Sequence, residues 1–259
     1  MIWGGIVENT KKKWYTIAYV ICIILLIVNL PFNYLIKNES ILSLINIACK
    51  ILAIFIFFIL IKKEKLHKIK LNGFCSKHLL FFPFLIACSS NIIVGLINNE
   101  YSDINTHNLI IDLFTCIFTA VIEELLFREL LLKELNFHYN PVKSIIISSL
   151  IFGSIHLLNI NSFASIPICL LQAGYTSLLG LMLGLIYLAS KNIIYPIFFH
   201  FTFNFLNDSL STNIFNLKWN STFFIVNISI SLIILMYGIY IYYIFKKEMT
   251  SNASTNMDF

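Results

Sequence analysis

Val121-Ile-Glu-Glu-Leu-Leu-Phe-Arg128 places two adjacent carboxylates and an arginine in a segment that is otherwise apolar enough to span a membrane. A charged side chain near the centre of a bilayer costs about 2.5 kcal/mol or more. These three ionisable groups therefore need partners, and they indicate a functional site. Glu124 and Arg128 are four positions apart, so they share a helix face and are expected to form an ion pair. Glu123 points about 100° away around the helix, which leaves it available for chemistry.

The composition sets the protein class. Of the 259 residues, 58% are hydrophobic and 12% are charged, whereas soluble domains carry about 25% charged residues. The mean hydropathy is +0.83. These values predict an all-α integral membrane protein with a single polytopic domain over residues 1–259. The net charge of +5 comes from lysines at the ends of apolar runs. That placement is typical of membrane topology, so it excludes nucleic acid as a partner and leaves membrane lipid.

Apolar runs predict a bundle of about eight transmembrane helices. The lysine clusters at 11–13 and 62–70 are expected to be cytoplasmic by the positive-inside rule. Both termini then lie in the cytoplasm of a multi-pass cell-membrane protein, and residues 249–259 form a disordered polar tail. The Ile-, Asn- and Lys-rich composition indicates a bacterial source. The expected spans are 14–30, 41–61, 79–97, 109–132, 144–158, 166–189, 193–206 and 223–245.

Two features inside the spans concern helix contacts. Gly174, Gly180 and Gly184 lie in the sixth expected span, where small residues allow helices to approach closely. Lys50 lies in the middle of the second span and has no assigned partner. Snorkelling to the membrane surface and pairing with Asp112 are the two alternatives for it.

Further polar residues fall at similar depths in two other spans. The fifth span contains Phe152 and His156, and the seventh contains His200 and Asn204 one helical turn apart. Each of these residues alone is most often an ordinary packing residue. Together with Glu123 they favour hydrolysis.

In that chemistry, a desolvated Glu123 activates a water as general base and His156 holds the water. His200 and Asn204 donate to the oxyanion that forms on the attacked carbonyl.

These residues resemble the CPBP family of intramembrane proteases, which includes the CAAX prenyl endopeptidases and bacterial abortive-infection proteins. The family motif EExxxR matches Glu123, Glu124 and Arg128. The motif FxxxH matches Phe152 and His156, and HxxxN matches His200 and Asn204. The resemblance covers about residues 109–208, the motif-bearing core. Glu129 is a departure, because many bacterial members carry glycine there.

The resemblance implies an eight-helix bundle with an intramembrane cavity open to the cytoplasm. It implies peptide-bond hydrolysis by Glu123, His156, His200 and Asn204, with Glu124, Arg128 and Phe152 in support. Zinc held by Glu123, His156 and His200 is an alternative. A metal-free mechanism without a cofactor is favoured, because the sequence has no HExxH motif and the structural view of CAAX members supports glutamate catalysis.

Two other functions stay open. One is a bacteriocin-immunity or regulatory membrane protein that binds a peptide in the same cavity without cleaving it. The other is a proton-coupled transporter, since intramembrane Glu and His residues also form proton relays. For the protease, the expected substrate is a membrane-associated protein or peptide. Bacteria generally lack CAAX prenylation, so pheromone or bacteriocin precursors fit better than a prenylated protein.

Overall fold

The computed structural model describes residues 39–63, 78–99, 101–161, 166–218 and 220–255, with the single residues Val20 and Ile36. The expected first span and most of the lysine cluster at 62–70 lie outside this part of the chain. Every regular element in the described part is a helix, apart from one isolated bridge between Tyr101 and Phe215. The prediction of an all-α protein is confirmed.

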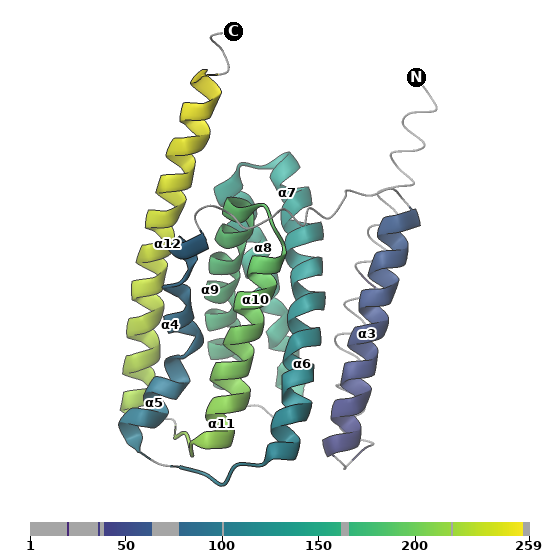
Figure 1. Cartoon of the computed structure of the whole chain (residues 1–259), viewed down its shortest axis with the longest axis vertical. Helices are drawn as coiled ribbons and strands as arrows, with labels where there is room; N and C mark the ends of the chain where they lie inside the picture. The colour runs from purple at the N-terminus through teal and green to yellow at the C-terminus, as the bar shows by residue number, and fades with distance from the viewer. Residues whose placement is uncertain are drawn as a thin grey trace.

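Long apolar helices run along the longest axis of the molecule (Figure 1). They are α3 (Glu39–Lys63), α8 (Pro141–Ile155), α9 (Ile166–Ser190) and α12 (Ser221–Thr255). Four stretches in the described part are long and apolar enough to cross a membrane, and they are Ile41–Ile59, Pro141–Leu158, Cys169–Ser190 and Ser221–Ile244. The chain is therefore a multi-pass membrane protein, while a total of eight spans stays a prediction.

The expected third span is not one helix. It is divided into a short 3-10 helix η1 (His78–Phe81), α4 (Phe84–Cys88) and α5 (Ser90–Asn98). Pro83 precedes α4 and lacks the N–H group that a continuous helix needs. Ser89 separates α4 from α5, and its hydroxyl donates to the Leu85 carbonyl. Such local side-chain bonds compete with the helical ladder.

The two helices that carry the first and third motifs change their winding inside the motif. Helix α6 (Thr106–Glu124) continues as the π-helical segment η2 (Leu125–Leu132) and then as α7 (Lys133–His138). Helix α10 (Ile194–Phe203) continues as the π-helical segment η4 (Asn204–Leu210) and then as α11 (Ser211–Ile214). Such π segments are frequently found at functional sites, and these two begin directly after Glu124 and at Asn204.

Local sequence signals account for the starts of two helices near the site. The Asn105 side chain accepts a hydrogen bond from the Asn108 N–H at the start of α6. The Asn140 side chain does the same for Lys143 at the start of α8, where Pro141 occupies the first turn. Asparagine is favoured before a helix because its side chain accepts from a backbone N–H that has no partner in the helix. Proline is favoured in the first turn because it lacks such an N–H.

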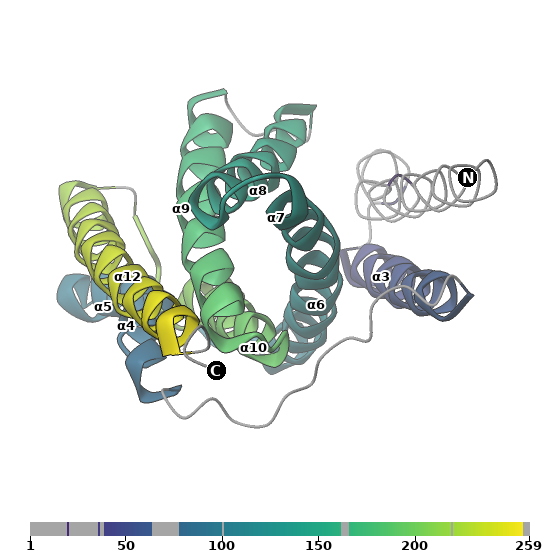
Figure 2. The ribbon, with the colours of Figure 1, turned by 90° about the horizontal axis from the view of Figure 1, so that it is seen from above.

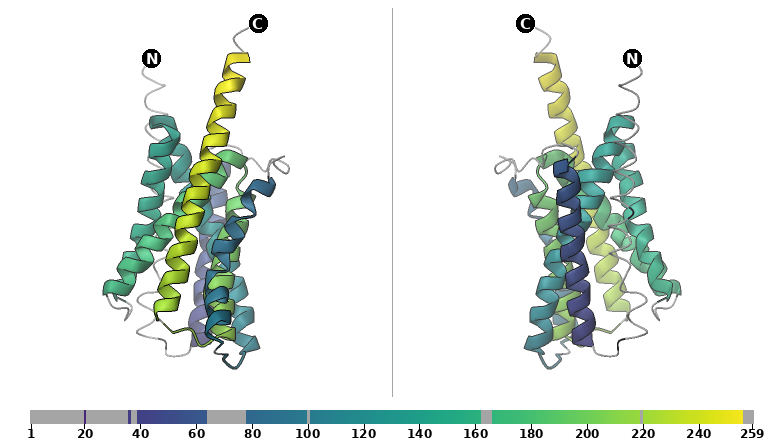
Figure 3. Two further views of the ribbon diagram at one scale, coloured as in Figure 1. Left: turned by 90° about the vertical axis from the view of Figure 1, so that its left-hand side faces the viewer. Right: turned by 90° about the vertical axis from the view of Figure 1, so that its right-hand side faces the viewer.

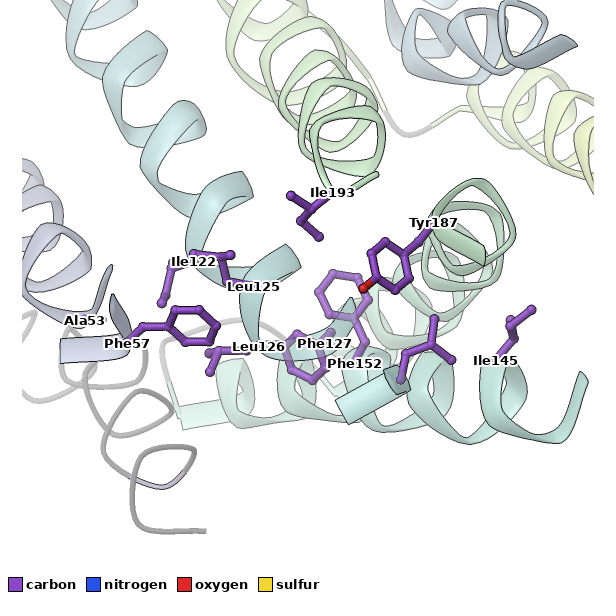
Figure 4. Close-up of a cluster of buried hydrophobic side chains, with 11 residues drawn as sticks. Ala53, Phe57, Ile122, Leu125, Leu126, Phe127, Ile145, Phe152, Tyr187 and Ile193 are labelled. Carbon is purple, nitrogen blue, oxygen red and sulfur yellow. The ribbon is translucent and has the colours of Figure 1, made fainter. Parts of the chain in front are cut away.

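Helices α6, α8, α9 and α10 are grouped together, with α3 beside α6 and α12 on the side of α4 and α5 (Figure 2). The side views place α12 and α3 on opposite flanks of the molecule (Figure 3). A buried cluster joins α3, α6, η2, α8 and α9, and Figure 4 shows Phe57 of α3 near Ile122 and Leu126. Large apolar side chains such as Phe55 of α3 and Ile233 of α12 are exposed. Exposed apolar side chains on a candidate span suit contact with lipid.

Glycines bring α8 and α9 close together. A Cβ at Gly153 of α8 would lie 1.9 Å from Ser177 Oγ and 2.5 Å from the Ala173 carbonyl oxygen. At Gly180 of α9 it would lie 3.1 Å from Ser149, and Gly184 is similarly close to Ile145. The prediction of close contact is wrong for Gly174, where a Cβ would meet nothing within 4 Å.

Helix α12 runs on to Thr255, so residues 249–255 are helical and the expectation of a disordered tail is wrong for them. The sequence from 239 to 255 contains no glycine or proline that would end the helix. Residues 256–259 lie outside the described part.

The glycine contact predicts a stability difference between two matched variants. Gly153→Ala is expected to destabilise the protein by about 1–3 kcal/mol, because the added methyl group forces α8 away from α9. Gly174→Ala is the control in the neighbouring helix, and its methyl group enters open space. Thermal unfolding in detergent measures both. Equal melting temperatures for the two variants would contradict the packing described here.

Candidate active site

Glu124 and Arg128 form the buried ion pair that their spacing predicts. Arg128 Nε lies 3.1 Å from Glu124 Oε2, and the two side chains are 1% and 0% exposed. This contact is electrostatic, since neither atom has a hydrogen-bond partner in the described part of the chain. Arg128 Nη2 also donates to the carbonyl of Gly180 at 3.3 Å. The pair thus links η2 to α9.

His200 lies between the two carboxylates of the first motif. Its Nδ1 is 2.7 Å from Glu124 Oε1, and its Nε2 is 3.6 Å from Glu123 Oε2. A carboxylate only accepts hydrogen bonds, so Nδ1 carries a proton and donates it to Glu124. The Glu123 side chain is 16% exposed, whereas that of Glu124 is fully buried. One carboxylate is therefore engaged on both sides and the other is accessible.

Phe152 connects all three motifs. Its ring contacts the imidazoles of His156 and His200 edge-to-face, at centroid distances of 5.5 and 5.7 Å. The guanidinium of Arg128 lies over the same ring, 4.8 Å from its centroid. Phe127 packs against the ring as well. The aromatic ring thereby fixes the spacing between two histidines and an arginine on three different helices.

His156 is the first residue after α8 and is half-buried. Its Nδ1 donates to the Phe152 carbonyl at 3.2 Å, because a carbonyl oxygen only accepts. That bond fixes the ring orientation and leaves Nε2 unengaged among the described residues. His156 reaches the other motifs through Phe152 rather than by a direct contact with Glu123.

Asn204 begins the π-helical segment η4, one turn after His200, and is partly buried. Its side chain makes no hydrogen bond to another residue in the described part. Asn207, one turn further on, anchors the segment firmly: its amide donates to the Ala87 carbonyl and accepts from the Asn91 N–H. Ser90 and Asn227 extend this polar network to α5 and α12.

The structure thus brings together most of the predicted site residues. Direct contacts join Glu123, Glu124, Arg128, Phe152 and His200, and His156 joins them through Phe152. Asn204 is placed next to them by its helix, without a direct contact to Glu123 or His200 in the described part.

Glu129, the departure from the family pattern, has two partners. Lys133 donates to its Oε1 at 2.6 Å, and Tyr187 of α9 donates to its Oε2 at 2.6 Å. The lysine one turn away could be found from the sequence, since a four-residue spacing favours such a pair. The tyrosine comes from a different helix and carried no sequence signal.

Lys50 follows neither of its two expected alternatives. Its residue is 7% exposed, and its ammonium donates to Thr119 of α6 at 2.6 Å. Asp112 instead has a hydrogen bond with Asn213. Thr119 is one turn before Glu123 on the same face of α6, so this hydrogen bond brings Lys50 close to the site. The sequence did not predict this position, because the contact joins two different helices.

Glu123, His156 and His200 are the residues that could hold a zinc ion in this site. A catalytic zinc needs three protein ligands and one open position. No group of three or more His, Cys, Asp or Glu side chains within the described ranges is arranged to hold a metal. Glu123 and His200 approach each other, but His156 does not complete a ligand set with them. The described side chains are therefore not arranged as a zinc site.

Comparison with known proteins finds a family model that matches the part of the chain containing this site. None of the curated proteins compared with the chain matches it. Residues 105–206 match the family model described as Type II CAAX prenyl endopeptidase Rce1-like. This range begins just before α6 and ends within η4, so it contains all three motifs. The match confirms the resemblance to the CPBP and CAAX proteases over residues 105–206.

Proposed function

We propose that the chain is an intramembrane endopeptidase that hydrolyses a peptide bond with a glutamate-activated water. The observation that carries the proposal is the position of His200 between a buried Glu124 and an accessible Glu123. The Rce1-like match over the same residues supports a protease. The substrate is a membrane-associated protein or peptide, because the site lies on helices packed among membrane spans.

The proposed reaction begins with attack on the substrate carbonyl. Glu123 takes a proton from a water while the water oxygen bonds to the carbonyl carbon. His156 Nε2 holds this water, since its Nδ1 is already bound to a backbone carbonyl. The carbonyl becomes an oxyanion, and His200 Nε2 and the Asn204 amide donate to it. Glu123 then passes its proton to the departing amine as the peptide bond breaks.

Glu124 and Arg128 act through His200 in this scheme. A buried carboxylate that accepts from Nδ1 fixes the ring orientation. The scheme uses His200 as the imidazolium, because only the doubly protonated ring donates from Nδ1 to Glu124 and from Nε2 to the oxyanion. Arg128 places a positive charge 3.1 Å from the other oxygen of Glu124. The proposed donor to the oxyanion is therefore held in place by a chain of buried charges.

We also propose that the end of the bundle where α3 and α12 terminate faces the cytoplasm. The α7–α8 loop and the α9–α10 turn lie at that same end (Figure 1). Lys133 begins α7, Lys143 lies in the first turn of α8, and Lys191 lies in the α9–α10 turn. Lysines in short loops indicate the cytoplasmic side of a membrane protein. The protein would then reside in the cell membrane of a bacterium.

Replacing Glu123 tests the proposed function. Peptides cleaved in cells that express the wild-type protein are expected to disappear in cells that express Glu123→Gln, because the amide takes up no proton from water. Peptidomics of the two strains provides the measurement. Glu134→Gln is the control, since this carboxylate is exposed on α7. Identical peptidomes would contradict a protease. If cells that express Glu123→Gln are still protected against a bacteriocin, an immunity protein is favoured. If the variant loses a pH-coupled flux, a transporter is favoured.

The two adjacent carboxylates are expected to differ in their effect on stability. Glu124→Gln leaves Arg128 buried without a counter-charge and is expected to cost about 3–5 kcal/mol. Glu123→Gln changes an accessible group outside that ion pair and is expected to leave the unfolding temperature almost unchanged. Thermal unfolding in detergent compares them. A larger loss for Glu123→Gln would show that the assigned roles are reversed.

Metal-free hydrolysis predicts that chelators have no effect. Protein treated with 1,10-phenanthroline and then dialysed is expected to cleave the peptides found above at its original rate. A zinc metallopeptidase assayed in the same buffer serves as the control for chelation. Loss of activity that added zinc restores would contradict the proposed mechanism.

A further inference from the structure

Lys50 is a buried cation that the proposed mechanism does not use. Its ammonium donates to Thr119 Oγ1, and that hydroxyl donates onward to the Thr115 carbonyl. Both contacts are to neutral groups. Lys50 takes part in none of the ion pairs found in the described ranges. A buried charge in a membrane-spanning helix whose partner among the described residues is neutral points to a functional site.

The position of Lys50 relates it to Glu123. Thr119 is four residues before Glu123, so the two lie on one face of α6, about 6 Å apart along the helix. Glu123 is also the one carboxylate whose charge acts on Lys50 among the described residues. The ammonium is thus about one helical turn from the proposed general base, without a direct ion pair to it.

Asn46 adds an acceptor on the same face of α3, one turn before Lys50. Its Oδ1 is buried and has no hydrogen-bond partner within the described part of the chain. Helices α3 and α6 run in the same direction, because Lys50 meets Thr119 while Phe57, further along α3, packs in the cluster with Leu126. Asn46 therefore lies beyond Lys50 as seen from Glu123, deeper from the end proposed to be cytoplasmic.

We propose that Lys50 and Asn46 form a subsite of the protease that binds a carboxylate of the substrate about two residues from the cleaved bond. An extended peptide advances about 3.3–3.6 Å per residue, so two residues cover the axial distance from Glu123 to Lys50. The ammonium binds the carboxylate, and Asn46 Oδ1 accepts from a nearby peptide N–H. The inference rests on the proposed function. The carboxylate belongs either to the C-terminus of the peptide or to an Asp or Glu side chain.

Binding experiments test the subsite separately from cleavage. Pools of short random peptides with an N-terminal fluorophore are bound to the Glu123→Gln protein in detergent, so that cleavage does not consume them. The first pool ends in a free carboxylate and the second in an amide. The third ends in an amide but has glutamate at the next-to-last position. Preference for the first pool over the second assigns the carboxylate to the chain terminus, and preference for the third assigns it to a side chain.

We expect a carboxylate pool to bind at least about tenfold more tightly than the amide pool, as charge-assisted hydrogen bonds allow. When Lys50→Met is added to the Glu123→Gln protein, the affinity for the carboxylate pool is expected to fall to that for the amide pool. The affinity for the amide pool is expected to stay unchanged. Lys50→Arg is expected to keep most of the preference. Lys143→Met is the control, because this lysine is exposed at the start of α8.

Two outcomes would overturn the subsite. One is equal binding of all three pools to protein that retains Lys50. The other is an equal loss for every pool on Lys50→Met, which a purely structural lysine would produce. If Lys50→Met does not fold, the ratio of the affinities for the carboxylate and amide pools on the Lys50→Arg protein still tests the subsite. Equal affinities for the two pools would then contradict it. Identical peptidomes for wild-type and Glu123→Gln cells, together with a preference for the carboxylate pool, would contradict the proposed hydrolysis but support the binding subsite.

Discussion

The site depends on the buried Glu124. Its two oxygens face different partners: one lies 2.7 Å from His200 Nδ1 and the other 3.1 Å from Arg128 Nε. None of these charges is stable alone in a low-dielectric interior. The energetic need to keep them together ties α6 and η2 to α10, and the Gly180 contact of Arg128 extends the link to α9. Stability and site geometry therefore share the same contacts.

Glycine packing and π-helical winding adjust the helices around these charges. Gly153 and Gly180 allow α8 to approach α9 closely, which brings Phe152 to Arg128 and to both histidines. The π segments begin where the first and third motifs present their residues. An extra residue in the turn shifts the angular position of everything after it, so an ideal α-helix would place Arg128 and Asn207 differently.

Lys50 and Glu129 show how one rule, that buried charges need partners, leads to different results. Glu129 is fully satisfied by Lys133 and Tyr187, and this network holds η2 against α9. Among the described residues, Lys50 donates to Thr119, which lies one turn before Glu123. Glu129 has both of its partners within the protein, which is typical of a structural role. Lys50 places a positive charge about one turn from the proposed general base, where a negatively charged group of the substrate can pair with it.

The sequence by itself determined the helical membrane class, the three motifs, and the ion pair between Glu124 and Arg128, because these follow from hydropathy and from spacing along one helix. It also indicated which of the two adjacent glutamates would be accessible. It did not predict the break at Pro83 and Ser89, the open surroundings of Gly174, or the continuation of α12 to Thr255. Only the tertiary structure decided that His200 bridges both carboxylates, that Phe152 joins the motifs, and that Lys50 meets Thr119. These contacts join residues far apart in the chain, and their geometry depends on how helices rotate and approach when their side chains pack.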